Sequence, residues 1–212
     1  IEGAKRYDAD LVIFSNPNNP SGSQLSRPEV IRLIESVDCL VVVDEAYMDF
    51  SDQSVLDLAG KYENLIVLRT LSKAMGLAGA RMGFAVSDPA LTFALRSVRD
   101  AYNVSAPDQA IAAVLLNHPE HRARTLAEIS RLMRLLKARL NGIAARSKQA
   151  MTVYPSVTNF VLVRLEDADA VSAAMHDRGI SLRQFDRQLI RISVAPEETL
   201  NRVLDLLEET VC

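Results

Sequence analysis

The chain has little of what marks secreted, membrane-spanning and nucleic-acid-binding proteins. Its 212 residues include two cysteines, Cys39 and Cys212, which is too few for a disulfide framework and favours a reducing compartment. No apolar run approaches the length of a membrane span. The net charge is −3, so no basic face for nucleic acid is predicted. We therefore expect a globular protein in a reducing compartment, which is the cytoplasm.

Short, nearly continuous apolar runs in the first half of the chain predict buried strands. They cover residues 11–15, 39–43, 65–69 and 83–86, and we expect them to be buried on both faces. Helical patterns over 26–36 and 55–61 lie between the first three runs. Alternation of strand and helix predicts an α/β fold, in which a mainly parallel sheet lies between two layers of helices.

The second half of the chain predicts a long helix and a smaller domain. Asp88 and Ser105 are N-cap residues for helices over 88–99 and 105–116. Apolar residues then recur every three or four positions from 126 to 143, which indicates one long helix with a buried stripe. Strands at 151–154, 160–165 and 189–194, with helices at 168–178 and 196–210, complete a small α+β unit. We predict a large domain over residues 1–121 and a small domain over 122–212 that includes the connecting helix.

Residues that carry chemistry follow three of the predicted strands. Asn19 follows the strand at 11–15, Asp44 follows the strand at 39–43, and Thr70 to Lys73 follow the strand at 65–69. Ligands of parallel α/β sheets bind at the carboxyl ends of the strands. These side chains are therefore expected at one edge of the sheet.

The stretch from Thr70 to Gly83 reads T-L-S-K-A-M-G-L-A-G-A-R-M-G. The Thr70 and Ser72 hydroxyls and the Arg81 guanidinium suit a phosphate dianion. A lysine beside that anion, here Lys73, can lose its proton and attack an aldehyde. Phosphate and aldehyde in one ligand indicate pyridoxal phosphate (PLP). On this stretch alone, a glycine-rich loop with a solvated lysine and arginine is an equal alternative.

Two further motifs give the chain a family resemblance. The stretch N-P-N-N-P-S-G begins at Asn16, and V-D-E-A-Y-M-D-F begins at Val43. Together with the Thr70 stretch they resemble the fold-type I PLP-dependent aminotransferases, and most of all the histidinol-phosphate aminotransferase branch. The resemblance implies PLP as cofactor, a small-molecule amino donor, a 2-oxo acid such as 2-oxoglutarate, and a homodimer. It also implies that an N-terminal part of the large domain, which would include the aromatic ring that stacks on the cofactor, is absent from this chain.

The resemblance also implies a role for each motif residue. Lys73 would form the Schiff base with PLP and later move a proton at the substrate. Asp44 would keep the pyridine nitrogen protonated, although an N-cap aspartate after a strand is the alternative. Tyr47 and Asn19 would bind the ring oxygen, and Thr70, Ser72 and Arg81 would bind the phosphate. Taken singly, Tyr47 is better explained as a half-buried aromatic and Asn19 as a turn residue, and only together with Asp44 and Lys73 do they favour the cofactor site.

In the predicted small domain, Arg191 matches the family arginine that binds the anionic group of the substrate, and Arg183 matches one used for substrate phosphate. Arginines that point outward from a strand are the ordinary alternative. Asn159 matches a family asparagine at the substrate, with core packing of the Asn-Phe pair as an equal alternative. Glu45 is expected to be structural, and Arg69, which precedes the motif, is not expected to be a ligand. The three histidines lack metal-ligand spacing, and no metal is predicted.

Two other functions remain open at this point. A PLP-dependent decarboxylase of a phosphorylated amino acid shares these motifs. A non-catalytic aminotransferase-like domain is the third reading, because the resemblance leaves part of the large domain unaccounted for.

Overall fold

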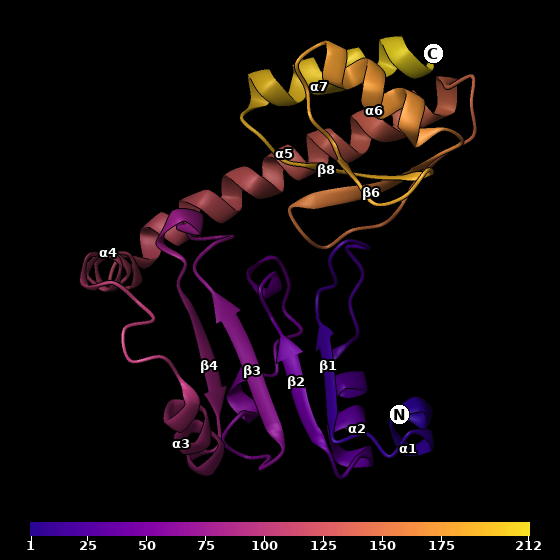
Figure 1. The fold of residues 1–212 in the computed structure, drawn as a ribbon. Coiled ribbons are helices and arrows are strands. Elements are labelled where there is room, and N and C mark those ends of the chain that lie inside the picture. Colours follow the sequence, from indigo (N-terminus) through magenta and orange to yellow (C-terminus); the bar gives the residue numbers. More distant parts are fainter. The chain divides into compact units, whose positions relative to one another are not determined.

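The computed structural model describes residues 1–212, which divide into two compact units. The first unit comprises Ile1–Asn18 and Gln24–Thr125, and the second comprises Asn19–Ser23 and Leu126–Cys212. Each unit contains one four-stranded sheet with helices (Figure 1).

The sheet of the first unit is mainly parallel, as the sequence predicts. It contains β1 (Leu11–Ser15), β2 (Leu40–Asp44), β3 (Leu65–Thr70) and β4 (Gly83–Ser87), in that spatial order. The first three strands are parallel, and β4 runs antiparallel to β3. The carboxyl ends of β1, β2 and β3 therefore lie at one edge of the sheet, which confirms the predicted α/β architecture.

The first unit contains four helices, of which two begin at the predicted caps Asp88 and Ser105. They are α1 (Glu2–Arg6), α2 (Arg27–Ser36), α3 (Pro89–Val98) and α4 (Ala106–Leu116), with short 3-10 turns η1 (Met48–Phe50), η2 (Leu56–Leu58) and η3 (Ala78–Ala80). A capping box between Ser26 and Glu29 starts α2, which satisfies backbone donors at the helix end. The predicted helix at 55–61 is wrong, because only η2 forms there. The segment is short and contains Gly60, so helix nucleation is unfavourable.

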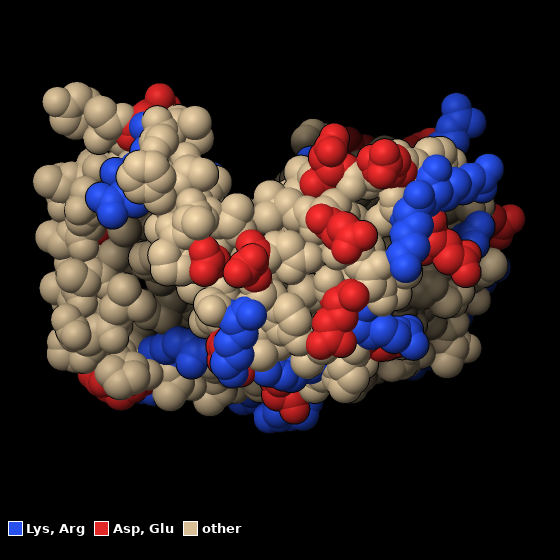
Figure 2. Space-filling model, turned by 90° about the horizontal axis from the view of Figure 1, so that it is seen from below, with Lys and Arg blue, Asp and Glu red and all other residues tan.

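Burial on both faces, predicted for all four strands, holds only for the central strands. The core of the unit joins Val30 and Ile34 of α2 to the buried side chains of β2 and β3. In β1, by contrast, Ile13 is 62% exposed, and Phe84 of β4 is 39% exposed. β1 and β4 are the two edge strands, and neither side chain belongs to a core cluster of the unit. Side chains stand perpendicular to a sheet, so their burial requires an element packed over the face on which they lie. Exposed apolar side chains continue on α3, and Figure 2 shows fewer charged residues on the side of α3 than on the side of α1 and α2.

The second unit is a small α+β domain built against one long helix. It contains α5 (Pro119–Arg146), which begins in the first unit, then β5 (Met151–Val153), β6 (Phe160–Leu165), α6 (Ala168–Asp177), β7 (Arg183–Gln184), β8 (Leu189–Ser193) and α7 (Glu197–Val211). The sheet order is β5-β6-β8-β7, and all neighbours are antiparallel. The predicted stripe of α5 is buried through Met133, Leu136, Leu140 and Ile143. Neither α5 nor any other helix is both long and apolar enough to cross a membrane.

Candidate active site

The carboxyl ends of β2 and β3 position two of the predicted cofactor residues. Asp44 is the last residue of β2, and Thr70 is the last residue of β3. Tyr47 lies three residues beyond Asp44 and is buried, and Lys73 lies three residues beyond Thr70 and is half-buried. The Lys73 Nζ is 5.2 Å from the centroid of the Tyr47 ring. The structure thus brings together the lysine and the tyrosine that the sequence assigned to one site.

The Asp44 carboxylate accepts a hydrogen bond within a turn and can accept further hydrogen bonds. One carboxylate oxygen accepts a hydrogen bond from the backbone N–H of Ala46 over 2.9 Å. The following short helix, η1, begins after Tyr47, so Asp44 caps a turn rather than a helix. An ionised carboxylate offers about four acceptor sites, and one backbone N–H occupies a single one of them. The remaining oxygen suits a protonated ring nitrogen.

The Thr70 and Ser72 hydroxyls form one polar cluster after β3. Thr70 Oγ1 lies 3.0 Å from Ser72 Oγ and accepts the backbone N–H of Ser72 over 3.1 Å. Close approach of the backbone at Gly83 supports this turn, because a Cβ there would lie 2.9 Å from the carbonyl oxygen of Arg69. Two hydroxyls at a strand end are donors of the kind that bind a phosphate oxygen.

Arg81 follows η3 in a left-handed backbone conformation, with φ of +52°. Non-glycine residues adopt this region uncommonly, and such residues cluster at functional sites. The guanidinium is exposed and donates to the carbonyl oxygen of Ala78 over 3.2 Å. No contact joins it to Thr70 or Ser72 in the structure, but it has no carboxylate partner and its charge remains available to an anion.

In the second unit, Arg191 is held by a hydrogen bond and an aromatic ring. Its Nη1 donates to Asn19 Oδ1 over 2.6 Å, and its Cζ lies 4.8 Å from the centroid of the Phe160 ring. Its Nε is buried and has no hydrogen-bond partner. A buried N–H without an acceptor is costly and uncommon in proteins. An anionic group of a ligand would satisfy this donor.

Arg183 and Arg191 are register partners on the neighbouring strands β7 and β8. Side chains opposite each other on antiparallel strands share one face, and like charges there are destabilising. The Cζ atoms of Arg183 and Arg191 lie 5.6 Å and 6.0 Å from the ring centroid of Phe185. Neither guanidinium pairs with a carboxylate, so the pair favours an anionic ligand.

No role for Phe185 was predicted from the sequence. It is the one aromatic residue between the candidate arginines Arg183 and Arg191, and that position is the signal that could have identified it. Asn159 is half-buried, and its carbonyl oxygen accepts the N–H of Val194 over 2.9 Å. This bond fastens the end of β8 and leaves both interpretations of the Asn159 side chain open.

The predicted site residues therefore form two groups, each within one unit. Asp44, Tyr47, Thr70, Ser72, Lys73 and Arg81 belong to the first unit, and Asn19, Asn159, Arg183 and Arg191 belong to the second.

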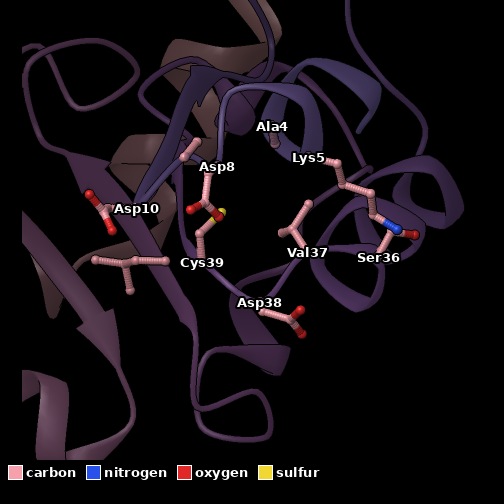
Figure 3. A pocket seen from close by; sticks show the side chains of 10 residues that line it. Ala4, Lys5, Asp8, Asp10, Ser36, Val37, Asp38 and Cys39 are labelled. Atoms are coloured by element: carbon pink, nitrogen blue, oxygen red, sulfur yellow. The ribbon is translucent and has the colours of Figure 1, made fainter.

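A hollow of about 590 Å³ lies at the opposite end of the first sheet, where β1 and β2 begin. Its lining includes Lys5 and three carboxylates, from Asp8, Asp10 and Asp38 (Figure 3). Three carboxylates repel a phosphate group. This hollow is therefore unsuited to the ligand that the other end of the sheet favours.

Comparison with known proteins agrees with this geometry. The profile of the family "aminotransferase class I and II" matches residues 1–207. A histidinol-phosphate aminotransferase of Thermoanaerobacter pseudethanolicus is 40% identical over 215 aligned positions, which cover 99% of this chain and 59% of that protein. The chain thus spans less than two thirds of the length of this relative.

Solved structures share the fold. The histidinol-phosphate aminotransferase of Sinorhizobium meliloti, solved with pyridoxal-5'-phosphate, superposes with a TM-score of 0.85 at 30% identity, over 98% of this chain and 59% of that one. A decarboxylase from Sulfurospirillum multivorans superposes with a TM-score of 0.85 at 25% identity, over 99% of this chain and 57% of that one. The family match over nearly the whole chain decides the assignment: the chain belongs to the class I and II aminotransferase family.

Proposed function

We propose that the protein containing this chain is a PLP-dependent aminotransferase of the histidinol-phosphate type. The observation that carries the proposal is the cluster at the ends of β2 and β3, where Lys73 lies against the Tyr47 ring. Around it stand a carboxylate with free acceptor capacity and two adjacent hydroxyls. This donor and acceptor set fits the three polar parts of PLP: its ring nitrogen, its ring oxygen and its phosphate.

Each cofactor residue has a proposed task. Asp44 keeps a proton on the ring nitrogen, because a carboxylate beside that nitrogen stabilises the charged form. Tyr47 and Asn19 donate hydrogen bonds to the ring oxygen. Thr70, Ser72 and Arg81 hold the phosphate through hydroxyl and guanidinium donors. When bound, PLP supplies the electron sink that stabilises a carbanion at the substrate.

Lys73 provides the covalent attachment and the proton transfer. Its Nζ lies 5.2 Å from the centroid of the Tyr47 ring, beside the strand ends that carry the other cofactor residues. We propose that the Lys73 amine would hold PLP covalently, and that the same amine, when free, would move a proton at the substrate carbon.

Arg191 and Arg183 are the proposed anchors of the anionic substrate groups. The buried Nε of Arg191 needs an acceptor, and the two adjacent guanidinium groups need a counter-charge. A substrate phosphate and a carboxylate supply both, so histidinol phosphate with 2-oxoglutarate satisfies the pair. Asn159 is proposed to contact substrate beside them.

A PLP-dependent decarboxylase of a phosphorylated amino acid is the second candidate, because a decarboxylase shares the fold over 99% of this chain. Both candidates need the same cofactor residues and the same anion anchors. They differ in which bond of the substrate breaks, so their products distinguish them.

We further propose that the protein is a homodimer in the cytoplasm. The cytoplasmic location is in keeping with two free cysteines.

The test is product analysis with the protein as it occurs naturally, including any residues before Ile1. It is supplied with PLP, histidinol phosphate and 2-oxoglutarate, and glutamate is measured. We expect glutamate that depends on histidinol phosphate and on Lys73. Carbon dioxide release from a phosphorylated amino acid, without glutamate, would replace the aminotransferase by the decarboxylase. Neither product from a correctly folded, PLP-saturated protein would favour a non-catalytic domain.

A further inference from the structure

Four charged side chains form a continuous set of ion pairs behind the cofactor cluster of the first unit. Arg69 donates from Nη1 to Glu45 over 2.9 Å and from Nη2 to Asp49 over 2.8 Å. Arg122, in the first turn of α5, donates to the same Asp49 oxygen over 2.5 Å. The set contains two carboxylates and two guanidinium groups, so its charges balance.

Glu45 is the most constrained member of this set. Its side chain is 0% exposed. Besides Arg69, it accepts the backbone N–H of Val55 over 2.7 Å and the Ser54 hydroxyl over 2.7 Å. A buried charge is tolerated when it is paired and hydrogen-bonded in this way, and removal of one partner is strongly destabilising. The carboxylate of Glu45 is therefore fixed in place by three donors.

The pair of Glu45 and Arg69 connects the two strand ends that carry the cofactor residues. Glu45 directly follows Asp44, and Arg69 directly precedes Thr70. The backbone N–H of Glu45 donates to Leu68 over 2.9 Å, which extends the parallel ladder one step past Asp44. Successive side chains of extended chain alternate between faces. Asp44 and Thr70 are therefore presented on the face opposite to the ion pair, one residue away from it on each strand.

We propose that Arg69 is a positioning residue for PLP. By binding Glu45 and Asp49 at once, it fixes the spacing between Asp44 at the end of β2 and the Thr70–Lys73 turn after β3. The ring nitrogen and the phosphate of one rigid cofactor must meet both strand ends, so a change in that spacing weakens the fit. Arg69 itself does not touch the cofactor. This inference rests on the proposed function.

The test compares Arg69→Met with Arg139→Met in the naturally occurring protein. Arg139 also pairs with two carboxylates, Asp205 at 2.7 Å and Glu208 at 3.5 Å, but it lies in the second unit. Three quantities are measured: the melting temperature without PLP, the Kd for PLP from a fluorescence titration, and the pH midpoint of the absorbance change of bound PLP.

We expect both substitutions to lower the melting temperature. Only Arg69→Met is expected to weaken PLP binding about tenfold or more and to move the pH midpoint. The double variant Glu45→Gln with Arg69→Met removes the unpaired buried carboxylate. It should recover melting temperature without recovering PLP affinity. Arg69→Lys, which keeps the charge but loses the fork that binds two carboxylates, should show the same separation if Arg69→Met does not fold.

The inference would be overturned if the Arg69 variants bound PLP with the affinity of the unaltered protein and kept its pH midpoint, despite a lower melting temperature. The ion pairs would then only stabilise the fold. An unaltered protein that does not bind PLP would instead overturn the proposed function and this inference together. The two failures are distinguished because the first requires normal binding by the unaltered protein.

Discussion

Arg191 and Asn19 are 172 positions apart in the sequence, yet the Arg191 guanidinium donates to the Asn19 amide oxygen over 2.6 Å. The bond ties a strand of the C-terminal unit to the short segment Asn19–Ser23, which clusters with that unit although its flanking residues belong to the other. A residue proposed to contact cofactor and a residue proposed to contact substrate are thus in direct contact. We therefore expect a substitution at Asn19 to affect substrate binding at Arg191, and a substitution at Arg191 to affect cofactor binding at Asn19.

Gly22→Ala tests how the Asn19–Ser23 segment is held. Gly22 has φ of +73°, and a Cβ there would lie 2.4 Å from the Ser156 hydroxyl oxygen. Strain and overlap together should reduce the free energy of unfolding by about 1–3 kcal/mol, measured by urea denaturation. Gly60→Ala is the control, because a Cβ there meets nothing within 4 Å. Equal effects of the two substitutions would contradict this account of Gly22.

Arg191→Lys tests the anion anchor. Lysine keeps the positive charge but loses the fork that reaches Asn19 and the planar stacking on Phe160. We expect the KM for the phosphorylated substrate to rise roughly 10- to 100-fold in steady-state kinetics, with a smaller change in PLP affinity. Arg202→Lys on α7, whose guanidinium donates to a backbone carbonyl, is the matched control. An unchanged KM in Arg191→Lys would remove Arg191 from the substrate site.

Asp44→Asn separates the charge of Asp44 from its turn-capping hydrogen bond. The asparagine oxygen can still accept the N–H of Ala46, so the turn should remain. We expect Lys73 to remain able to attach PLP, while turnover falls at least about 100-fold because the ring nitrogen is no longer held protonated. Asp44→Ala should lose turnover equally. Near-normal turnover in Asp44→Asn would mean that Asp44 acts only as a cap.

The 212-residue chain, taken by itself, is expected to self-associate. Phe93 and Val98 on α3 are 75% and 82% exposed, and β4 is an edge strand. Exposed apolar surface and an unpaired strand edge favour association. Sedimentation velocity should show concentration-dependent oligomers of the chain, and Phe93→Asp should reduce them. A stable monomer across the concentration range would show that the exposed apolar side chains of α3 and the free edge of β4 do not cause association.

The sequence predicted the sheets and the buried stripe of α5 well, because strand and helix periodicity depend on local pattern. Residues 39–43 are a continuous apolar run, residues 160–165 are an apolar run interrupted by Arg164, and both lie in mostly buried strands. Exposure of Ile13 could not be predicted this way, because it depends on which elements pack over each face of the sheet. The two-residue strand β7 and the helix α1 were missed, since each is too short to show a period.

Motif residues of the candidate site were visible in the sequence, but their supporting contacts were not. The hydroxyls, lysine and arginine of the Thr70 stretch all lie within residues 70–81, so their chemistry can be read directly. The bonds from Arg69 to Glu45 and Asp49 span 24 and 20 positions, and a sequence pattern contains no signal for such pairing. The link from Arg191 to Asn19 is longer still and required the fold.

The most direct test of the account is to locate the residue that binds PLP. The naturally occurring protein is incubated with PLP, reduced with borohydride and digested, and the peptides are examined by mass spectrometry. We predict the pyridoxyl mass on Lys73, and its loss in Lys73→Ala. A pyridoxyl group on Lys5, Lys61, Lys137 or Lys148 of the unaltered protein, with Lys73 unlabelled, would contradict the central claim.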